Sequence, residues 1–218
     1  MNRYRQNLIN FAVLGLLPIY ILIHIFLIPE SVGIEAISDS GHVSIITLAL
    51  IGCTLLSLVT LIVNKELSHL KFTLIAMAYV VLIYFLRELD FHRLFTLEHI
   101  TKAKFYTALA VPLWQKILVG LITAFFILCF SYLLIKYTTF IWKKFREYEP
   151  WAVAIVLWFL ILLFSQLCDK SSLNDFYEGR AIEESSECFA AIFAFLALIQ
   201  AMPKLFMSKS CEETPVQE

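Results

Sequence analysis

Apolar residues occur along the chain in long blocks separated by short polar segments. Six blocks of about 18 to 23 residues carry almost no charge, and each is long enough to cross the hydrocarbon core of a bilayer. They lie at about 8–28, 44–63, 72–92, 113–135, 151–168 and 186–206. Because a spanning segment must satisfy its own backbone hydrogen bonds, such blocks form helices in lipid. The pattern predicts an all-α, polytopic membrane protein with about six transmembrane helices in a single bundle.

The segments between the blocks are too short to form another domain. The longest of them runs from Arg93 to Pro112. We therefore predict one transmembrane domain over residues 1–207 and a short polar tail over 208–218. The first block begins near Leu8 and is not followed by a small-residue cleavage site, so we expect it to be retained as a span.

Composition supports lipid as the solvent of this chain. The sequence is 60% hydrophobic and 16% charged, whereas an average soluble domain is about half apolar and a quarter charged. The net charge is −1. No Lys/Arg cluster is interleaved with aromatic residues, which argues against nucleic-acid binding. Membrane lipids are the expected partners, and the sequence identifies no protein partner.

Basic residues indicate how the chain is oriented. Six spans place both termini on one side, and the loops on that side carry ten Lys and Arg residues against seven on the other. Positively charged loops stay in the cytoplasm. Lys143, Lys144 and Arg146 follow Trp142, as in a basic, aromatic-anchored segment at a cytoplasmic interface. We predict cytoplasmic termini in a bacterial inner membrane or plasma membrane.

The carboxylates gather on the opposite, outer side, where 12 of the 18 Asp and Glu residues fall. His42, His92 and His99 join them, and His24 lies in the outer half of the first span. Any chemistry is therefore expected at the outer face.

The outer end of the third span holds the first candidate cluster. Tyr84, Arg87, Glu88, Phe91 and His92 have the spacing of one helical stripe. Glu88 and His92, one turn apart, are able to share a metal ion, or the carboxylate can orient the imidazole as a general base. The alternative is an ion-paired helix end that includes Arg87, because charges near lipid normally find partners.

The sixth span begins with the second cluster. Arg180, Glu183, Glu184 and Glu187 occupy one stripe if the helix is continuous. Like charges this close require compensation, from Arg180, from basic residues of the preceding outer loop such as Lys102 and Lys104, or from a divalent cation. The helix dipole alone would also favour Glu183 and Glu184 at a helix N-terminus. Glu187 lies deepest, and an ionisable residue at that depth suggests a function.

Three further polar positions accompany these clusters. Gln166 and Asp169 lie one turn apart at the outer end of the fifth span, and Asp169 is a candidate metal ligand. His24 is expected to be a buried, hydrogen-bonded group within the bundle. Pro18, earlier in the same span, is expected to kink it.

The five cysteines contain no C-x-x-C pair, so neither a zinc ribbon nor a thioredoxin-type site is indicated. Cys53 and Cys129 are expected to be small buried hydrophobes. Cys168 and Cys188 lie near the outer ends of consecutive spans, and we predict that they are close enough to form a disulfide.

These patterns favour a membrane-embedded enzyme with an outer-leaflet site, a hydrolase or transferase acting on a lipid or lipid-linked substrate. Glu88, His92 and Glu187 are the predicted catalytic residues. A divalent metal ion is a candidate cofactor, and it would activate water. Its predicted ligands are Glu88, His92, Glu184, Glu187 and Asp169. The predicted ligands of an anionic headgroup are Arg87, Arg93 and Arg180, since the guanidinium fork matches phosphate geometry.

Two other classes stay open. The outer charges are also consistent with a non-catalytic ion- or lipid-binding sensor, or with a subunit of a membrane complex whose charges are ion-paired structure. A cation-coupled carrier is less favoured, because the inner halves of the spans hold almost no charged residue to continue a pathway.

Overall fold

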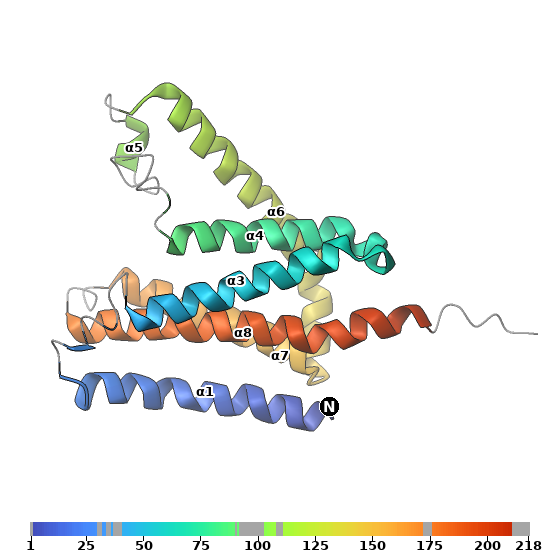
Figure 1. The fold of residues 1–218 in the computed structure, drawn as a ribbon, viewed down its shortest axis with the longest axis horizontal. Coiled ribbons are helices and arrows are strands. Elements are labelled where there is room, and N and C mark those ends of the chain that lie inside the picture. The colour runs from blue at the N-terminus through green and yellow to red at the C-terminus, as the bar shows by residue number, and fades with distance from the viewer. Residues whose placement is uncertain are drawn as a thin grey trace, which may run out of the picture. The chain divides into compact units, whose positions relative to one another are not determined.

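The computed structural model describes residues 2–29, 32–33, 36, 41–89, 91, 103–107, 111–171 and 176–210, and within these ranges the chain forms helices and no β-strand. The helices, drawn in Figure 1, are α1 (Arg3–Phe26), α3 (His42–Val63), the 3₁₀ helix η1 (Lys65–Leu70), α4 (Lys71–Glu88), α5 (Ala103–Thr107), α6 (Leu113–Arg146), α7 (Pro150–Asp169) and α8 (Tyr177–Ser210). Six stretches are long and apolar enough to cross a membrane, with η1 and α4 forming one of them. The predicted all-α class with six spans is confirmed.

Two helices extend well beyond the predicted spans. The fourth span was expected to end near residue 135, but α6 continues to Arg146; the sixth was expected to begin near 186, but α8 begins at Tyr177. Each has 34 residues and is therefore about 51 Å long, against about 30 Å for the hydrocarbon core. Hydropathy identifies only the part of a helix that suits lipid, whereas the backbone hydrogen bonds continue into polar sequence. The predicted tail thus begins inside α8, and residues 211–218 lie outside the described residues.

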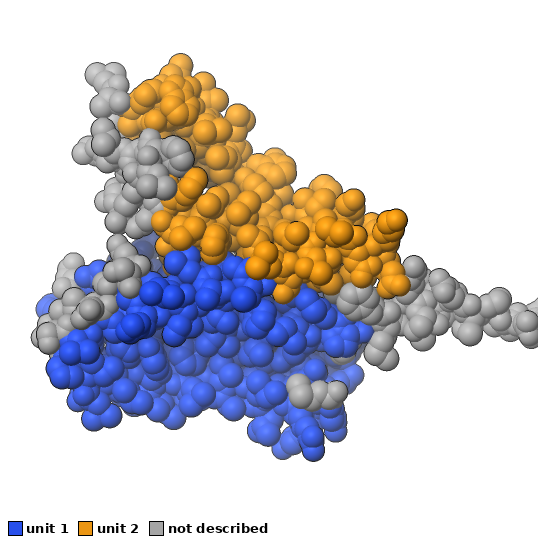
Figure 2. All heavy atoms as spheres, in the orientation of Figure 1, with its two compact units in different colours: residues 1–54, 139–218 blue, residues 55–138 orange. Residues whose placement is uncertain are grey.

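The chain divides into two compact units, which Figure 2 shows in different colours. Unit 1 comprises residues 1–54 and 139–218, and unit 2 comprises residues 55–138. Both boundaries fall inside helices, in α3 and in α6. The single domain over residues 1–207 stays a prediction.

Unit 1 is built around α8, which packs against both α7 and α1. The apolar window of α8 is 61% buried, compared with 33% or less in the other five spans. The core where α1, α7 and α8 meet contains Leu17, Ala154, Ile161, Phe189, Ala190, Phe193 and Ala197. The three alanines allow the helix backbones to approach closely, as small residues do between helices in membranes. On another face of α8, Ala181 and Cys188 pack with Val43 of α3.

Two buried amides join α1 to α8 near the N-terminus of α1. Asn10 Nδ2 donates to the Pro150 carbonyl at 2.9 Å and to Gln200 Oε1 at 3.4 Å, and Gln200 Nε2 donates to Asn10 Oδ1 at 2.9 Å. Asn10 is fully buried. We call Asn10, Gln200 and the Pro150 carbonyl the amide clasp, because it holds three helices at one level.

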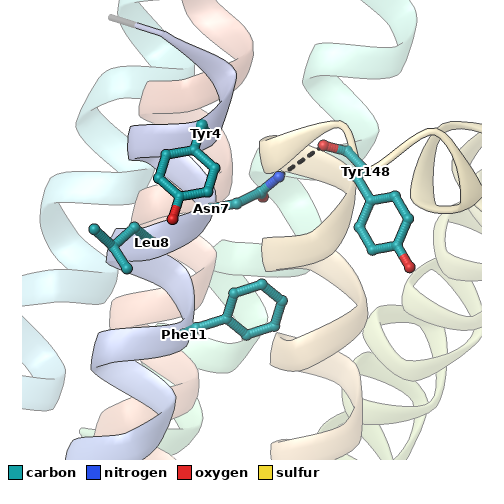
Figure 3. Close-up of a pocket in the computed structure, with 5 residues that line it drawn as sticks. All are labelled: Tyr4, Asn7, Leu8, Phe11 and Tyr148. Carbon is teal, nitrogen blue, oxygen red and sulfur yellow. Dashed lines mark hydrogen bonds between the residues drawn. The ribbon is translucent and has the colours of Figure 1, made fainter.

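The turn between α6 and α7 closes this same end of unit 1. The Glu149 N–H donates to the Lys144 carbonyl and the Tyr148 N–H to the Phe145 carbonyl, which is the Schellman pattern of a helix C-terminus. Tyr148 has φ of 55°, a left-handed conformation that usually belongs to glycine and costs other residues about 1–2 kcal/mol. Asn7 Nδ2 donates to its carbonyl at 2.8 Å (Figure 3).

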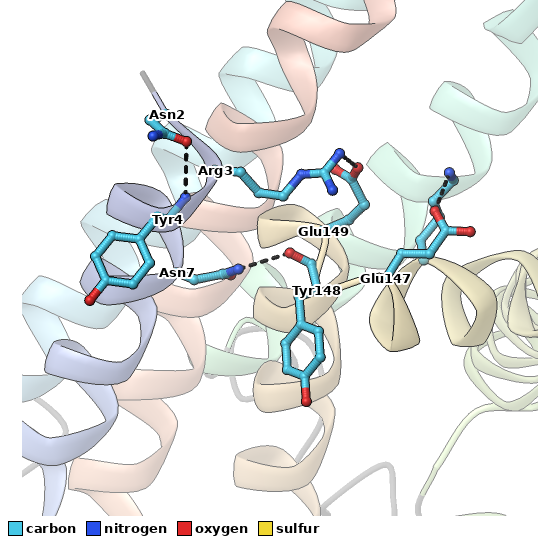
Figure 4. Close-up of polar contacts among 8 residues, drawn as sticks. Asn2, Arg3, Tyr4, Asn7, Glu147, Tyr148 and Glu149 are labelled. Atoms are coloured by element: carbon cyan, nitrogen blue, oxygen red, sulfur yellow. Dashed lines mark hydrogen bonds and ion pairs between the residues drawn. The ribbon is translucent and has the colours of Figure 1, made fainter.

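Two ion pairs surround the turn (Figure 4). Arg3 pairs with Glu149, whose carboxylate is buried where α7 begins. An anion at a helix N-terminus is favoured by the helix dipole. Lys144 donates to Glu147 at 2.7 Å, and this hydrogen bond lowers the pKa of the Glu147 carboxyl. Both carboxylates of the turn therefore have basic partners.

Helix α1 passes through Pro18 without a break in the helical backbone. A proline inside a helix has no N–H to donate to the carbonyl four residues earlier. Pro18 lies between the amide clasp at Asn10 and the C-terminal end of the helix near His24. One backbone hydrogen bond is therefore missing between these two polar positions.

Unit 2 is held together by hydroxyl groups between α4 and α6. Thr73 shares a 2.8 Å hydrogen bond with the Tyr137 hydroxyl and a 3.4 Å contact with that of Tyr132, to which Lys136 donates at 2.7 Å. Further along, the Tyr79 hydroxyl donates to the Ile122 carbonyl at 3.1 Å. Long tyrosine side chains thus connect the two helices at two levels.

Candidate functional site

The predicted site residues are distributed over both units. Asp169, Arg180, Glu184 and Glu187 belong to unit 1, together with Cys168 and Cys188, whereas Arg87 and Glu88 belong to unit 2. His92 and Arg93 lie outside the described residues. The predicted meeting of Glu88 and His92 with Glu187 stays a prediction.

The acidic stripe lies on one continuous helix, α8, as its spacing requires. It comprises Arg180, Glu183, Glu184 and Glu187. Burial increases steadily along it: Arg180 is exposed, Glu183 and Glu184 are half-buried, and Glu187 is 4% exposed. The stripe therefore runs from the surface of unit 1 into its interior. Glu187 is the deepest carboxyl, as predicted from its place in the apolar run.

Glu187 meets α7 through Ser165. The Ser165 hydroxyl donates to Glu187 Oε1 at 3.4 Å, and Ser165 is itself fully buried. This pair sets the level at which α7 and α8 face each other. A carboxyl and a hydroxyl thus lie together about one turn before the C-terminal end of α7.

The contacts between α1 and α8 fix which residues share that level. The two helices are antiparallel, because Asn10 meets Gln200 while Tyr20 stacks near Phe189 with ring centroids 6.0 Å apart. His24 lies one turn beyond Tyr20 on α1, and Ser185 lies one turn before Phe189 on α8. We refer to Tyr20, His24, Ser165, Ser185 and Glu187 as the polar layer of unit 1.

His24 is buried, as predicted, at 3% exposure. Its Nε2 shares a 3.0 Å hydrogen bond with the Tyr20 hydroxyl one turn away. The Tyr177 hydroxyl, at the start of α8, donates to the His24 backbone carbonyl at 3.1 Å. Tyr177 also lies against Gly33, where an added Cβ would come within 1.8 Å of its hydroxyl oxygen.

Some buried polar atoms near the polar layer have no hydrogen-bond partner. They are His24 Nδ1, Ser185 Oγ and, on α7, Gln166 Nε2. More than nine in ten buried polar groups in proteins are paired, and exceptions are commonly met by a bound water, ion or ligand. The polar layer therefore has hydrogen-bonding capacity that the protein's own side chains do not use.

Comparison with protein-family models, curated proteins and solved structures gives no match to this chain. The function is therefore argued from this geometry alone.

The helix that carries the first predicted cluster, α4, is shorter than expected. Helix α4 ends at Glu88, so the helical stripe that was expected to continue to His92 stops one turn earlier within the described part of the chain. Arg87 Nε lies 3.8 Å from Glu88 Oε1. This contact agrees with the alternative interpretation of an ion-paired helix end.

The metal and disulfide predictions have separate outcomes. Among the described residues, no group of three or more His, Cys, Asp and Glu side chains is placed to hold a metal ion. Cys168 and Cys188 are buried thiols that are not bonded to each other, and their disulfide stays a prediction about the oxidised protein. Cys129 is buried as expected, but Cys53 is exposed. An outward position in an apolar helix suits lipid as well as a core does, which is why the pattern misplaced it.

Sequence reasoning missed four members of the site, Tyr20, Ser165, Ser185 and Tyr177. Each carries a hydroxyl within or beside an apolar run, a pattern that is common in membrane helices and carries little information by itself. The available signal was the recurrence of such hydroxyls in the outer halves of the first, fifth and sixth spans.

Proposed function

We propose that this chain is a membrane-embedded enzyme that uses Glu187 as a general acid or base on a lipid or lipid-linked substrate. The observation that carries the proposal is a carboxyl buried in the interior of a membrane-spanning helix, beside polar atoms that have unused hydrogen-bonding capacity. Ionisable groups at such depth are costly and mark functional sites in membrane proteins.

The depth of the polar layer suits a lipid substrate. Glu187 lies ten residues after the start of α8, and the graded stripe of Glu183 and Glu184 leads from it to the surface. A substrate whose ester or phosphate sits near the headgroups would reach this level from the bilayer. A carboxyl at this level would lie within reach of the leaving group and of the attacking nucleophile, as general acid–base catalysis requires.

Arg180 would bind the negative headgroup of such a substrate at the mouth of the stripe, with Arg87 and Arg93 as further candidates. Glu184 and Asp169 would join Glu187 as ligands if a divalent cation takes part, and Glu88 and His92 would complete that set. The reaction would be a hydrolysis or a group transfer, with the carboxyl or the cation activating the nucleophile.

We further propose that both termini are cytoplasmic, in a bacterial inner membrane or plasma membrane, which places the polar layer in the outer leaflet. Support comes from the basic, aromatic end of α6, where Arg146 stacks over Trp142 at 5.4 Å. Labelling of single cysteines introduced at Asn2 and at Phe176 tests this orientation. Reaction of Phe176→Cys with an impermeant reagent only from the cytoplasmic side would contradict it.

The test of catalysis compares Glu187→Gln with Glu178→Gln, an exposed carboxyl in the first turn of the same helix. The purified proteins are placed in nanodiscs with phosphatidylethanolamine, phosphatidylglycerol and a polyprenyl diphosphate, with either EDTA or added Mg²⁺, Mn²⁺ and Zn²⁺. Mass spectrometry follows the products. We expect Glu187→Gln to lower turnover about 10²- to 10⁴-fold, and Glu178→Gln to match the wild type.

A second function, from the non-catalytic class, is favoured by one observation. The buried Ser165 hydroxyl of α7 donates to the buried Glu187 of α8, as in a polar network that only holds helices together. A sensor or complex subunit with such a network would show no turnover of any probe. Its Glu187→Leu variant would unfold at a lower temperature, because Ser165 would lose its acceptor. Turnover abolished by Glu187→Gln in a protein of unchanged stability would exclude this class.

A further inference from the structure

At the end of unit 1 opposite the polar layer, an apolar groove opens beside the N-terminal turns of α1. Its lining residues are Tyr4, Asn7, Leu8, Phe11 and Tyr148, and its volume is about 340 Å³. Figure 3 shows Phe11 projecting from α1 toward the turn that carries Tyr148. The groove therefore lies between one helix face and the turn from α6 to α7.

Tyr148 is an unusual residue for its place in this turn. It adopts the left-handed conformation that ends α6, where glycine is the usual residue. The Asn7 side chain fixes the Tyr148 carbonyl, so the turn is tied to α1. A strained residue that also forms the wall of a groove suggests that its side chain has a role in binding.

The two chain segments that line the groove are rich in basic residues. Residues 2–5 and 143–149 contain five Lys and Arg side chains and two carboxylates. Those two carboxylates, Glu147 and Glu149, pair with Lys144 and Arg3. The remaining basic residues are all exposed to solvent or headgroups, and they are Arg5, Lys143 and Arg146.

We propose that this groove is a binding site for an anionic glycerophospholipid, with an acyl chain between Phe11 and Tyr148 and the phosphate beside Arg5 and Lys143. The smooth apolar faces of the other spans would contact any lipid. This groove differs because an apolar cleft and an excess of positive charge occur together at the end of a span, where headgroups lie. The site is separate from the polar layer and does not depend on the enzymatic proposal.

The test is native mass spectrometry of the purified full-length protein with equal amounts of phosphatidylglycerol and phosphatidylcholine that carry identical acyl chains. We expect the wild type to retain phosphatidylglycerol preferentially. Each of Arg5→Gln and Lys143→Gln should lower that preference about fivefold, since a basic residue at a membrane surface contributes about that factor.

Two further variants test the groove itself. Leu8→Trp should fill it and lower phosphatidylglycerol retention, whereas Leu16→Trp, an equally exposed leucine of α1 outside the groove, should not. Tyr148→Gly should relax the turn and raise the unfolding temperature, yet weaken lipid retention, so its effect cannot come from misfolding. Equal retention of the two lipids by the wild type, or equal behaviour of Leu8→Trp and Leu16→Trp, would overturn the proposal.

Discussion

The amide clasp and the polar layer, both in unit 1, differ in how their buried polar groups are paired. In the amide clasp, both the nitrogen and the oxygen of the Asn10 side chain are hydrogen-bonded, to Gln200 and to the Pro150 carbonyl. In the polar layer, His24 Nδ1 and Ser185 Oγ are equally buried but have no hydrogen-bond partner. Both clusters place polar atoms among α1, α7 and α8. They differ in whether every buried donor and acceptor has a hydrogen-bond partner.

In a lipid environment, the pairing of buried polar groups helps to distinguish a structural cluster from a functional one. Water is absent from the bilayer core, so an unsatisfied polar group there costs several kcal/mol. A fully matched network is stable and specifies one packing arrangement, whereas a partly matched one is a liability unless something else completes it. The clasp therefore stabilises unit 1, and the polar layer is where a water, ion or substrate group is expected.

The largest effect should come from breaking the clasp. Asn10→Leu leaves the Gln200 amide and the Pro150 carbonyl buried without their partner, and should lower the free energy of unfolding by about 2–3 kcal/mol. Denaturation in mixed micelles measures the change. The double variant Asn10→Leu/Gln200→Leu should recover part of the loss, because it removes one stranded group. A double variant less stable than either single one would show that the two amides do not act as a pair.

A smaller loss of stability is expected from Gly33→Ala, beside Tyr177. The added Cβ would lie 1.8 Å from the Tyr177 hydroxyl oxygen and 2.5 Å from its Cζ. Tyr177 would have to move and release the His24 carbonyl, at a cost of about 1–3 kcal/mol for overpacking. Gly15→Ala is the control: nothing lies within 4 Å of its Cβ, and alanine in a helix interior should raise stability by about 0.5–1 kcal/mol. Equal thermal unfolding of the two variants would contradict the close contact at Gly33.

Removal of a hydroxyl that has no hydrogen-bond partner should not lower the free energy of unfolding, in contrast to the two preceding changes. Ser185→Ala takes away a buried oxygen that has no partner, so the free energy of unfolding should stay the same or rise by up to about 1 kcal/mol. Ser186 is the matched control, because its hydroxyl donates to the Ile182 carbonyl at 2.7 Å and Ser186→Ala should bring no such gain. If Ser185→Ala lowered the free energy of unfolding more than Ser186→Ala, the contrast between the amide clasp and the polar layer would fail.

The smallest effect concerns the exposed ion pair beside the clasp. The hydrogen bond from Lys144 lowers the pKa of Glu147 in the folded protein. The pair therefore stabilises the fold fully above the unfolded pKa of about 4.3, and the contribution disappears as the pH falls through the lower folded value. Unfolding temperatures measured between pH 3 and pH 6 should decline less steeply for Lys144→Gln than for the wild type. Parallel curves would show that the pair contributes nothing.

The six spans and the depth of Glu187 and His24 were predictable, because hydropathy and distance along a helix are local properties of the sequence. The partners were not. Asn10 and Gln200 are separated by 190 residues, and a lone polar residue in an apolar run signals that a partner exists without naming it. The ends of α6 and α8 also escaped prediction, since polar residues continue a helix as well as apolar ones do. The meeting of Glu88 with Glu187 stays a prediction for the same reason as the clasp was missed: sequence places residues along helices and not helices beside each other.

Pro18 has a mechanical consequence for α1. The helix is anchored at Asn10 by the amide clasp. The backbone hydrogen bond that Pro18 cannot donate is missing between Asn10 and His24. Bending stiffness is therefore lowest between the anchored half and the half that carries Tyr20 and His24. A helix bends most easily where such a hydrogen bond is missing, so the segment with Tyr20 and His24 can pivot while the segment with Asn10 stays in place. Such a pivot would vary the width of the polar layer without disturbing the core below it.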